Sequence, residues 1–168
     1  MELLKVKGIL ADFEQMADWD NQPQILPFIT VNFKEGTRHQ KLDAYDMFKH
    51  GLKKAHFWIV VDGRKIGYVT YDVNPPHLLI SSEESVWISI CIGEKDSWGR
   101  GYAKEAMALL ENEVKKAGYK RIELGVFSYN SRARSLYEKM NYQEFATIKK
   151  FTYYLDRWHD DIRMQKYV

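Results

Sequence analysis

Hydrophobic and polar residues alternate along several short runs of the chain, which is the pattern of β-strands with one buried face. Asp62-Gly63 is typical of a two-residue hairpin turn, and Asp156-Arg157 indicates a second chain reversal. The alternation predicts strands at residues 3–10, 56–61, 66–73, 86–92, 122–126, 145–155 and 161–167.

Between these strands, apolar residues recur three and four positions apart, the spacing of helices that pack on a sheet. Asp12 can cap a short helix over residues 12–19 that must end before Pro23, and residues 20–36 are expected to form a loop. Further helices are predicted at residues 38–54, 101–117 and 130–140. The order is therefore strand, two helices, three strands, helix, strand, helix and two strands.

Length and composition predict one globular domain spanning residues 1–168, with 45% hydrophobic residues. The 25 basic and 23 acidic residues are interspersed, so the net charge of +2 predicts no nucleic-acid partner. Cys91 is the only cysteine, which excludes an internal disulfide and fits a reducing compartment. The N-terminal residues lack a signal-peptide core and the apolar runs are too short to span a bilayer, so we expect a cytoplasmic protein with no membrane partner.

A two-glycine turn joins a predicted strand to a predicted helix: Trp98-Gly99-Arg100-Gly101-Tyr102-Ala103. Such a turn aims unpaired backbone N–H groups and the positive end of the helix dipole at one point, which favours an anionic ligand such as a pyrophosphate. The Gly-Lys-Ser/Thr triplet of a P-loop is absent, and Lys104 stands where a dinucleotide-binding turn has its third glycine. A nucleotide-binding protein is therefore the hypothesis that fits this turn least well.

The turn resembles the acyl-CoA-binding signature of the GNAT superfamily of N-acetyltransferases, Gln/Arg-x-x-Gly-x-Gly/Ala, with Trp98, Gly101 and Ala103 at the defined positions. Tryptophan at the first position is similar to the branch that contains ribosomal-protein, polyamine and aminoglycoside N-acetyltransferases. A second segment resembles the downstream motif of the superfamily, Asn-x-x-Ala with Tyr-Glu-Lys-x-Gly-Phe; its residues here are Asn130, Ala133, Tyr137, Glu138, Lys139, Asn141 and Tyr142.

The resemblance implies an α+β fold, a single-domain αβα sandwich. Its mixed, mostly antiparallel central sheet would have about seven strands and about four flanking helices, with two central parallel strands splayed around the cofactor. The motifs cover about residues 84–168, and the layout of elements extends the resemblance to residues 1–83. The implied activity moves an acetyl group from acetyl-CoA to a primary amine, a protein N-terminus or a small-molecule amine, by direct attack in a ternary complex. A homodimer is also implied, because related enzymes often dimerise.

The resemblance also assigns roles to individual residues. Ile90 and Ile92 would pair with the pantetheine arm through their backbone, where an N–H would also polarise the thioester carbonyl. Asn130 would bond the pantetheine amides, and Tyr137, as a phenol, would protonate the departing thiolate. The side chains of Arg100 and Lys104 are either solvated or paired with the pyrophosphate. The pyrophosphate would be received by the backbone N–H groups of Trp98, Gly99, Arg100, Gly101, Tyr102, Ala103 and Lys104.

The acceptor side has a weaker signature. Trp19, Asp20 and Asn21 precede Pro23 in a segment that resembles the Trp-x-Asn-Asp-Pro segment of this branch, and Asp20 can attract a cationic amine. A helix stop before proline explains the same residues equally well. Relatives often carry Glu where this chain has Trp87, so no general base is assigned. A non-catalytic acyl-CoA-binding or sensing module therefore remains an alternative. The histidines lack metal-ligand spacing, so no metal is predicted.

Overall fold

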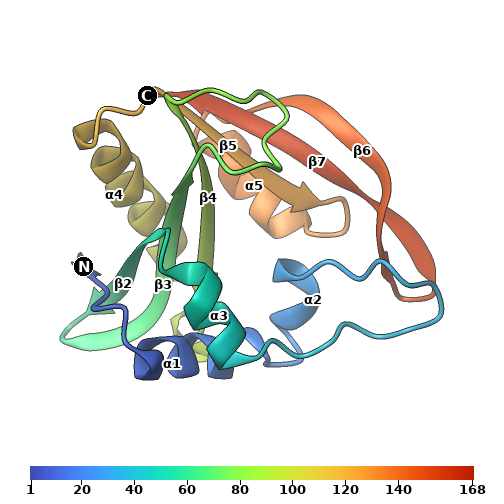
Figure 1. Ribbon diagram of the computed structural model, residues 1–168, viewed down its shortest axis with the longest axis horizontal. Coiled ribbons are helices and arrows are strands. Elements are labelled where there is room, and N and C mark those ends of the chain that lie inside the picture. Colours follow the sequence, from blue (N-terminus) through green and yellow to red (C-terminus); the bar gives the residue numbers. More distant parts are fainter.

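The computed structural model describes residues 1–168 and contains one seven-stranded sheet with the strand order β1-β2-β3-β4-β5-β7-β6 (Figure 1). All neighbouring strands are antiparallel except the central pair, β4 and β5. The strands are β1 Glu2–Lys5, β2 Ala55–Val61, β3 Arg64–Val73, β4 Ser85–Ile92, β5 Arg121–Phe127, β6 Gln143–Tyr154 and β7 Arg157–Tyr167. This mixed, mostly antiparallel sheet confirms the predicted fold class.

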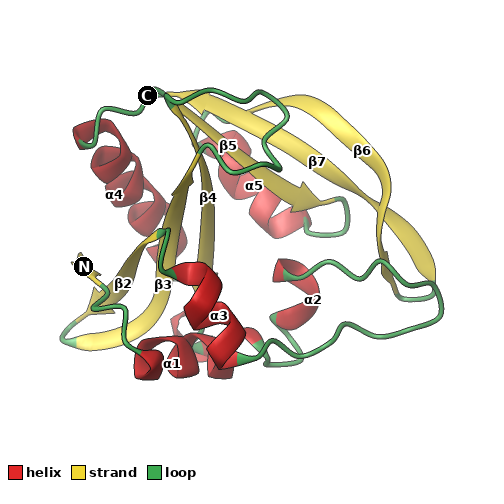
Figure 2. Ribbon diagram, in the orientation of Figure 1, coloured by secondary structure: helices red, strands yellow, loops and turns green.

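Helices cover both faces of the sheet, so the molecule has three layers (Figure 2). One face carries the two helices that each follow a central strand, and the opposite face carries the helices of the N-terminal half. The helices are α1 Leu10–Asp20, α2 Leu26–Ile29, α3 Ala44–Gly51, α4 Tyr102–Lys116 and α5 Ser131–Lys139, with a 3₁₀ turn at Lys95–Ser97. The single-turn helix α2 lies inside the predicted loop over residues 20–36.

Each face of the sheet has its own hydrophobic core. The larger core lies under α4 and α5 and includes fully buried Met107, Leu110 and Val114 from the apolar stripe of α4. The smaller core lies under α1 and includes Phe13 and Trp58. Because side chains alternate along a strand, β4 contributes Val86 and Ile88 to the first core and Cys91 to the second.

The central strands β4 and β5 pair only at one end. Three residue pairs are in register, from Ser85 with Arg121 to Trp87 with Glu123, and the strands then diverge. In Figure 1 they meet near the C-terminus and separate toward α1 and α2. The predicted splay of two parallel central strands is therefore present. Beyond Trp87, the edge of β4 that faces β5 has no strand partner, and its backbone groups are open to a ligand.

The first strand is shorter than predicted. It ends at Lys5 rather than at residue 10 because the chain turns at Gly8, whose φ is 78°. The carboxylate of Asp12 accepts hydrogen bonds from the backbone N–H groups of Gly8 and Ile9, at 3.0 and 3.3 Å. Asp12 therefore caps α1 from inside its first turn, and the helix begins two residues earlier than predicted, at Leu10.

The helix predicted at residues 38–54 is also shorter, because only Ala44–Gly51 is helical. The side chain of Asn21 donates to the carbonyl of Leu42 and accepts from its N–H, at 2.8 and 2.7 Å, which holds that residue outside the helix. Asp43 then caps α3 by accepting from the N–H of Asp46 at 2.9 Å. Helical spacing alone did not reveal that side chains compete for this backbone.

The helix ends and the last hairpin follow their turn chemistry. Gly118 and Asn141, which follow α4 and α5, have positive φ angles of 90° and 66°, as predicted for helix stops. In the final hairpin the two turn residues are Leu155 and Asp156, both with positive φ. The turn lies one residue earlier than predicted, and β7 begins directly after it at Arg157, four residues before the predicted start at residue 161.

Candidate functional site

The glycine turn between β4 and α4 requires glycine for its backbone conformation. Gly99 and Gly101 have φ angles of 77° and 83°, and a Cβ atom on either would meet nothing within 4 Å. Both residues are exposed, and Gly101 is the N-cap of α4. The turn therefore has left-handed backbone geometry and an open surface, so a ligand can approach its backbone closely.

Five consecutive backbone N–H groups in this turn, those of residues 99–103, donate to no backbone carbonyl. The two ends of the predicted cradle are already engaged. The N–H of Trp98 donates to the carbonyl of Lys95 at 3.2 Å, and that of Lys104 to Gly101 at 3.0 Å. The side chains of Arg100 and Lys104 are exposed and form no ion pair with the protein. The turn thus presents five free donors with two cationic side chains beside it, an arrangement that suits an anionic ligand.

Trp98 contacts residues on both sides of the divergence, one in β4 and one in α5, the helix that follows β5. Its indole N–H donates to the carbonyl of Ile92, the last residue of β4, at 2.8 Å. The Arg132 guanidinium at the start of α5 lies 5.7 Å from the centre of the Trp98 ring. The Ile92 carbonyl is therefore already occupied, whereas Ile90 lies in the part of β4 that has no partner on the β5 side.

The downstream motif, residues 130–142, follows β5 on the other side of the divergence. The Asn130 side-chain oxygen caps α5 by accepting from the N–H of Ala133 at 3.2 Å, which leaves the amide NH₂ group without a protein partner. Tyr137 is buried in the larger core, and the centre of its ring lies 5.8 Å from that of Tyr142. Burial raises the pKa of Tyr137 to about 12, so its hydroxyl keeps its proton at neutral pH.

On the face covered by α1, the middle of β4 is accessible. Ser89 is exposed although it lies in a central strand, because neither β5 nor a helix covers it. Trp87, on the same face, fills the narrow end of the divergence. Its ring lies 4.6 Å from that of His77 and 4.9 Å from the Arg163 guanidinium, and a Cβ atom on Gly125 would approach it to 2.9 Å. A packed aromatic ring therefore occupies position 87, where no acidic residue is present.

The three acceptor-side residues have different environments. The Trp19 indole donates to Glu94 at 2.9 Å and packs so closely on Gly93 that a Cβ atom there would lie 2.0 Å from the ring. Asn21 is engaged with Leu42. Asp20 alone has a free polar atom: Tyr68 donates to its Oδ2 at 2.5 Å, whereas its Oδ1 is buried without a hydrogen-bond partner.

A buried charge network lies at the narrow end of the divergence and was not predicted. The carboxylate of Glu123, which is fully buried, binds Arg121 at 2.7 Å and Arg163 at 3.2 Å, and Arg163 also binds Asp161 at 2.6 Å. The two arginines donate to the carbonyls of Ile80 and His77 in the loop between β3 and β4. The available signal was a pair of opposite charges two residues apart in each of two neighbouring strands, a spacing that places both charges of a pair on one face.

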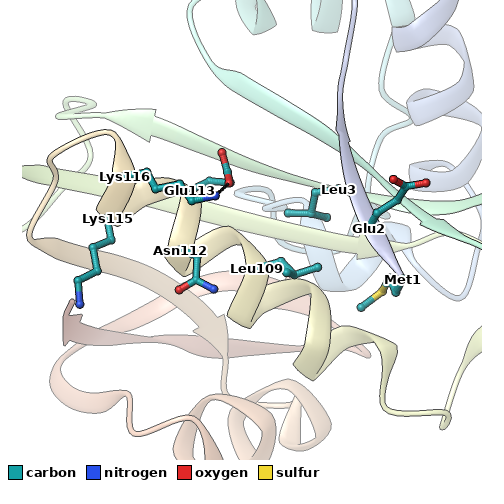
Figure 3. A pocket seen from close by; sticks show the side chains of 8 residues that line it. All are labelled: Met1, Glu2, Leu3, Leu109, Asn112, Glu113, Lys115 and Lys116. Atoms are coloured by element: carbon teal, nitrogen blue, oxygen red, sulfur yellow. Dashed lines mark hydrogen bonds and ion pairs between the residues drawn. The ribbon is translucent and has the colours of Figure 1, made fainter.

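An open groove between β1 and α4 lies away from these residues (Figure 3). It brings together none of the predicted site residues; its lining is Met1, Glu2, Leu3, Leu109, Asn112, Glu113, Lys115 and Lys116. No cluster of three or more His, Cys, Asp or Glu side chains is arranged to hold a metal ion. None of the helices has the length and apolar character needed to cross a bilayer.

Comparison with known proteins agrees with this geometry. The model of the Acetyltransferase (GNAT) family matches residues 13–142, which include both motifs. The N-acetyltransferase YycN of Bacillus subtilis (strain 168), described as uncharacterized, is 30% identical over 103 residues, or 59% of this chain. That match spans 64% of the relative's length.

Two solved structures share the fold at low sequence identity. Ribosomal-protein-alanine N-acetyltransferase from Brucella melitensis has a TM-score of 0.72 and 17% identity, with 100% of both chains covered. The protein yncA from Salmonella typhimurium, solved with its cofactor acetyl-CoA, has a TM-score of 0.71 and 13% identity, with 99% of this chain and 94% of that chain covered. With a family model matched over most of its length and both motifs in place, the chain belongs to the acetyltransferase (GNAT) family.

Proposed function

We propose that the protein is an acetyl-CoA-dependent N-acetyltransferase that acetylates a primary amine by direct attack in a ternary complex. The observation that carries this proposal is the juxtaposition of the five free N–H groups of the glycine turn with the unpaired edge of β4. The first feature suits a pyrophosphate, and the second suits an extended arm with amide groups. Acetyl-CoA contains a pyrophosphate followed by an extended arm with amide groups, in the same order as the two parts of the site.

On the donor side, N–H groups of residues 99–103 would hold the pyrophosphate, with Arg100 and Lys104 adding positive charge. The pantetheine arm would lie along β4 near Ile90. The free amide of Asn130, at the start of α5, would bond its amide groups from the other side of the divergence. A backbone N–H of β4 would polarise the thioester carbonyl and stabilise the oxyanion of the tetrahedral intermediate.

On the reaction side, the neutral amine would attack the thioester carbon, and the C–S bond would break as the C–N bond is completed. Tyr137 would donate its proton to the departing thiolate, because burial keeps the phenol protonated at neutral pH. Tyr137 lies on the α4 and α5 side of the sheet, whereas exposed Ser89 faces the α1 side. Thiol and amine would therefore occupy opposite sides of the divergence.

Release of coenzyme A tests this function directly. The purified protein is incubated with acetyl-CoA and a panel containing an alanine-starting peptide, spermidine, an aminoglycoside and an amino sugar. We expect amine-dependent thiol release with at least one class. Turnover with none of them, despite acetyl-CoA binding measured by calorimetry, would instead support the non-catalytic acyl-CoA-binding module. The observation that favours this second candidate is Trp87, a packed ring in place of an acid.

Replacing Gly101 by alanine should weaken acetyl-CoA binding by about 10-fold or more, because alanine at a φ of 83° is strained and the turn must shift to relieve it. Gly36 is a matched control, since its φ is 72° and a Cβ atom would also meet nothing within 4 Å. Gly36→Ala should have a similar effect on the melting temperature and none on the acetyl-CoA dissociation constant. Equal effects of both variants on that constant would show that the turn does not hold the ligand.

A further inference from the structure

Asp20 combines deep burial with an unused hydrogen-bonding atom. Its side chain lies at the end of α1 and is 2% exposed. One carboxylate oxygen accepts from the Tyr68 hydroxyl at 2.5 Å, and the other has no partner. A buried carboxylate normally has partners for both oxygens, because an unpaired buried acceptor is costly. The free oxygen is therefore unexplained by packing or by the capping of α1.

The position of Asp20 relates this oxygen to the reaction. Its partner Tyr68 is on β3 directly opposite Cys91 of β4, and Cys91 is two residues from exposed Ser89. Two residues along a strand span about 7 Å, and Ser89 is the exposed residue of β4 on the same face as Cys91. Asp20 thus lies on the α1 face of the divergence, opposite the face that holds Tyr137.

The ionisation of Asp20 is controlled by burial and two neutral neighbours. Burial raises the pKa of the Asp20 carboxyl from 3.8 to about 6, and the hydrogen bond from Tyr68 of β3 and the neighbouring Cys91 thiol of β4 act in the opposite direction. No charged side chain perturbs the pKa of Asp20. Burial also raises the pKa values of Tyr68 and Cys91 well above their ordinary values, so both remain neutral. Asp20 is therefore the one charged group of this cluster at pH 7.

We propose that the free oxygen of Asp20 accepts a proton from the acceptor ammonium, directly or through one water, before the amine attacks. This inference rests on the proposed function and supplies the general base that the sequence did not identify. The proton moves from the ammonium nitrogen to Oδ1, the neutral amine forms the C–N bond, and the C–S bond breaks. The thiolate takes the Tyr137 proton, Tyr137 is reprotonated from the second amine proton, and Asp20 releases its proton to solvent.

The test is the pH dependence of turnover in Asp20→Asn, using the alanine-starting peptide or spermidine, whichever the wild type acetylates faster. We expect a loss of about 100-fold at pH 7 that shrinks toward pH 9.5, because alkaline solvent then deprotonates the amine without help. Acetyl-CoA binding should be unchanged. A loss that is constant across pH, or no loss, would overturn the proposal while leaving the proposed function intact. Absence of wild-type turnover would overturn both.

Two further variants separate proton transfer from structural support. In Tyr68→Phe the hydrogen bond that lowers the pKa of Asp20 is lost, so the acid limb of turnover should move to higher pH; an unmoved limb would count against the assignment. Asp12 is the matched control, a buried carboxylate on the same helix whose oxygen is engaged with Gly8 and Ile9. Asp12→Asn should lower the melting temperature and leave the pH profile unchanged.

Discussion

Replacing Tyr137 by phenylalanine should lower turnover by about 100-fold or more at pH 7, with little change in acetyl-CoA binding. The variant removes one hydroxyl and keeps the ring that packs in the larger core. The hydroxyl has no hydrogen-bond partner in the protein, so its loss should leave the melting temperature nearly unchanged or slightly higher. Single-turnover measurements of thiol release, together with calorimetry of acetyl-CoA binding, separate the chemical step from binding.

Tyr142→Phe provides the matched control for this experiment. Tyr142 is also buried in the larger core, and its ring lies 5.8 Å from that of Tyr137. We expect this variant to retain wild-type turnover. If both variants lose activity equally, or if Tyr137→Phe loses binding as much as turnover, Tyr137 does not act as the acid. Because the pKa of Tyr137 is about 12, its deprotonation should produce no alkaline loss of activity below pH 10.

Replacing Glu123 by glutamine should destabilise the protein strongly, by about 3–5 kcal/mol, because it leaves buried Arg121 and Arg163 without their shared carboxylate. For a chain of this size the melting temperature should fall by about 6–20 °C. The loss is a large part of the whole stability of a typical domain, about 5–15 kcal/mol. Thermal unfolding followed by circular dichroism measures the effect.

The surface ion pair between Glu84 and Lys120 is the comparison for this variant. Both side chains are more than half exposed, so Glu84→Gln should change the stability by about 1 kcal/mol at most. A similarly small effect of Glu123→Gln would show that the two arginines find other partners. The network also anchors the loop at residues 77–80, so Glu123→Gln should increase amide hydrogen exchange there before it does so elsewhere.

Much of the fold follows from local sequence patterns, because alternation and helical spacing record which face of each element is buried. The apolar stripe of α4 predicted the extent of that helix closely, and Gly118 and Asn141 predicted the left-handed residues that end α4 and α5. Two of the errors occur where side chains bind the backbone. Asp12 and Asn21 determine where β1 ends and where α3 begins, through hydrogen bonds that hydrophobic periodicity does not record.

The glycine turn of the candidate site was predictable for a similar reason. Backbone N–H groups need a turn of particular φ angles, and glycine marks that turn in the sequence. The environments of Asp20 and Glu123 depend instead on contacts between distant segments, since Asp20 contacts Tyr68 and Glu123 contacts Arg163, 48 and 40 residues apart. Only the folded chain shows which of many carboxylates is buried, paired or left with a free oxygen.

The contact between Trp19 and Gly93 has an evolutionary consequence. Any side chain at position 93 would overlap the indole ring, so position 93 cannot gain a side chain while Trp19 is kept. A larger residue at 93 requires a smaller one at 19, and the new residue at 19 must also give up the hydrogen bond to Glu94. Related sequences should therefore show correlated substitutions at these two positions, with glycine at 93 kept wherever tryptophan is kept at 19.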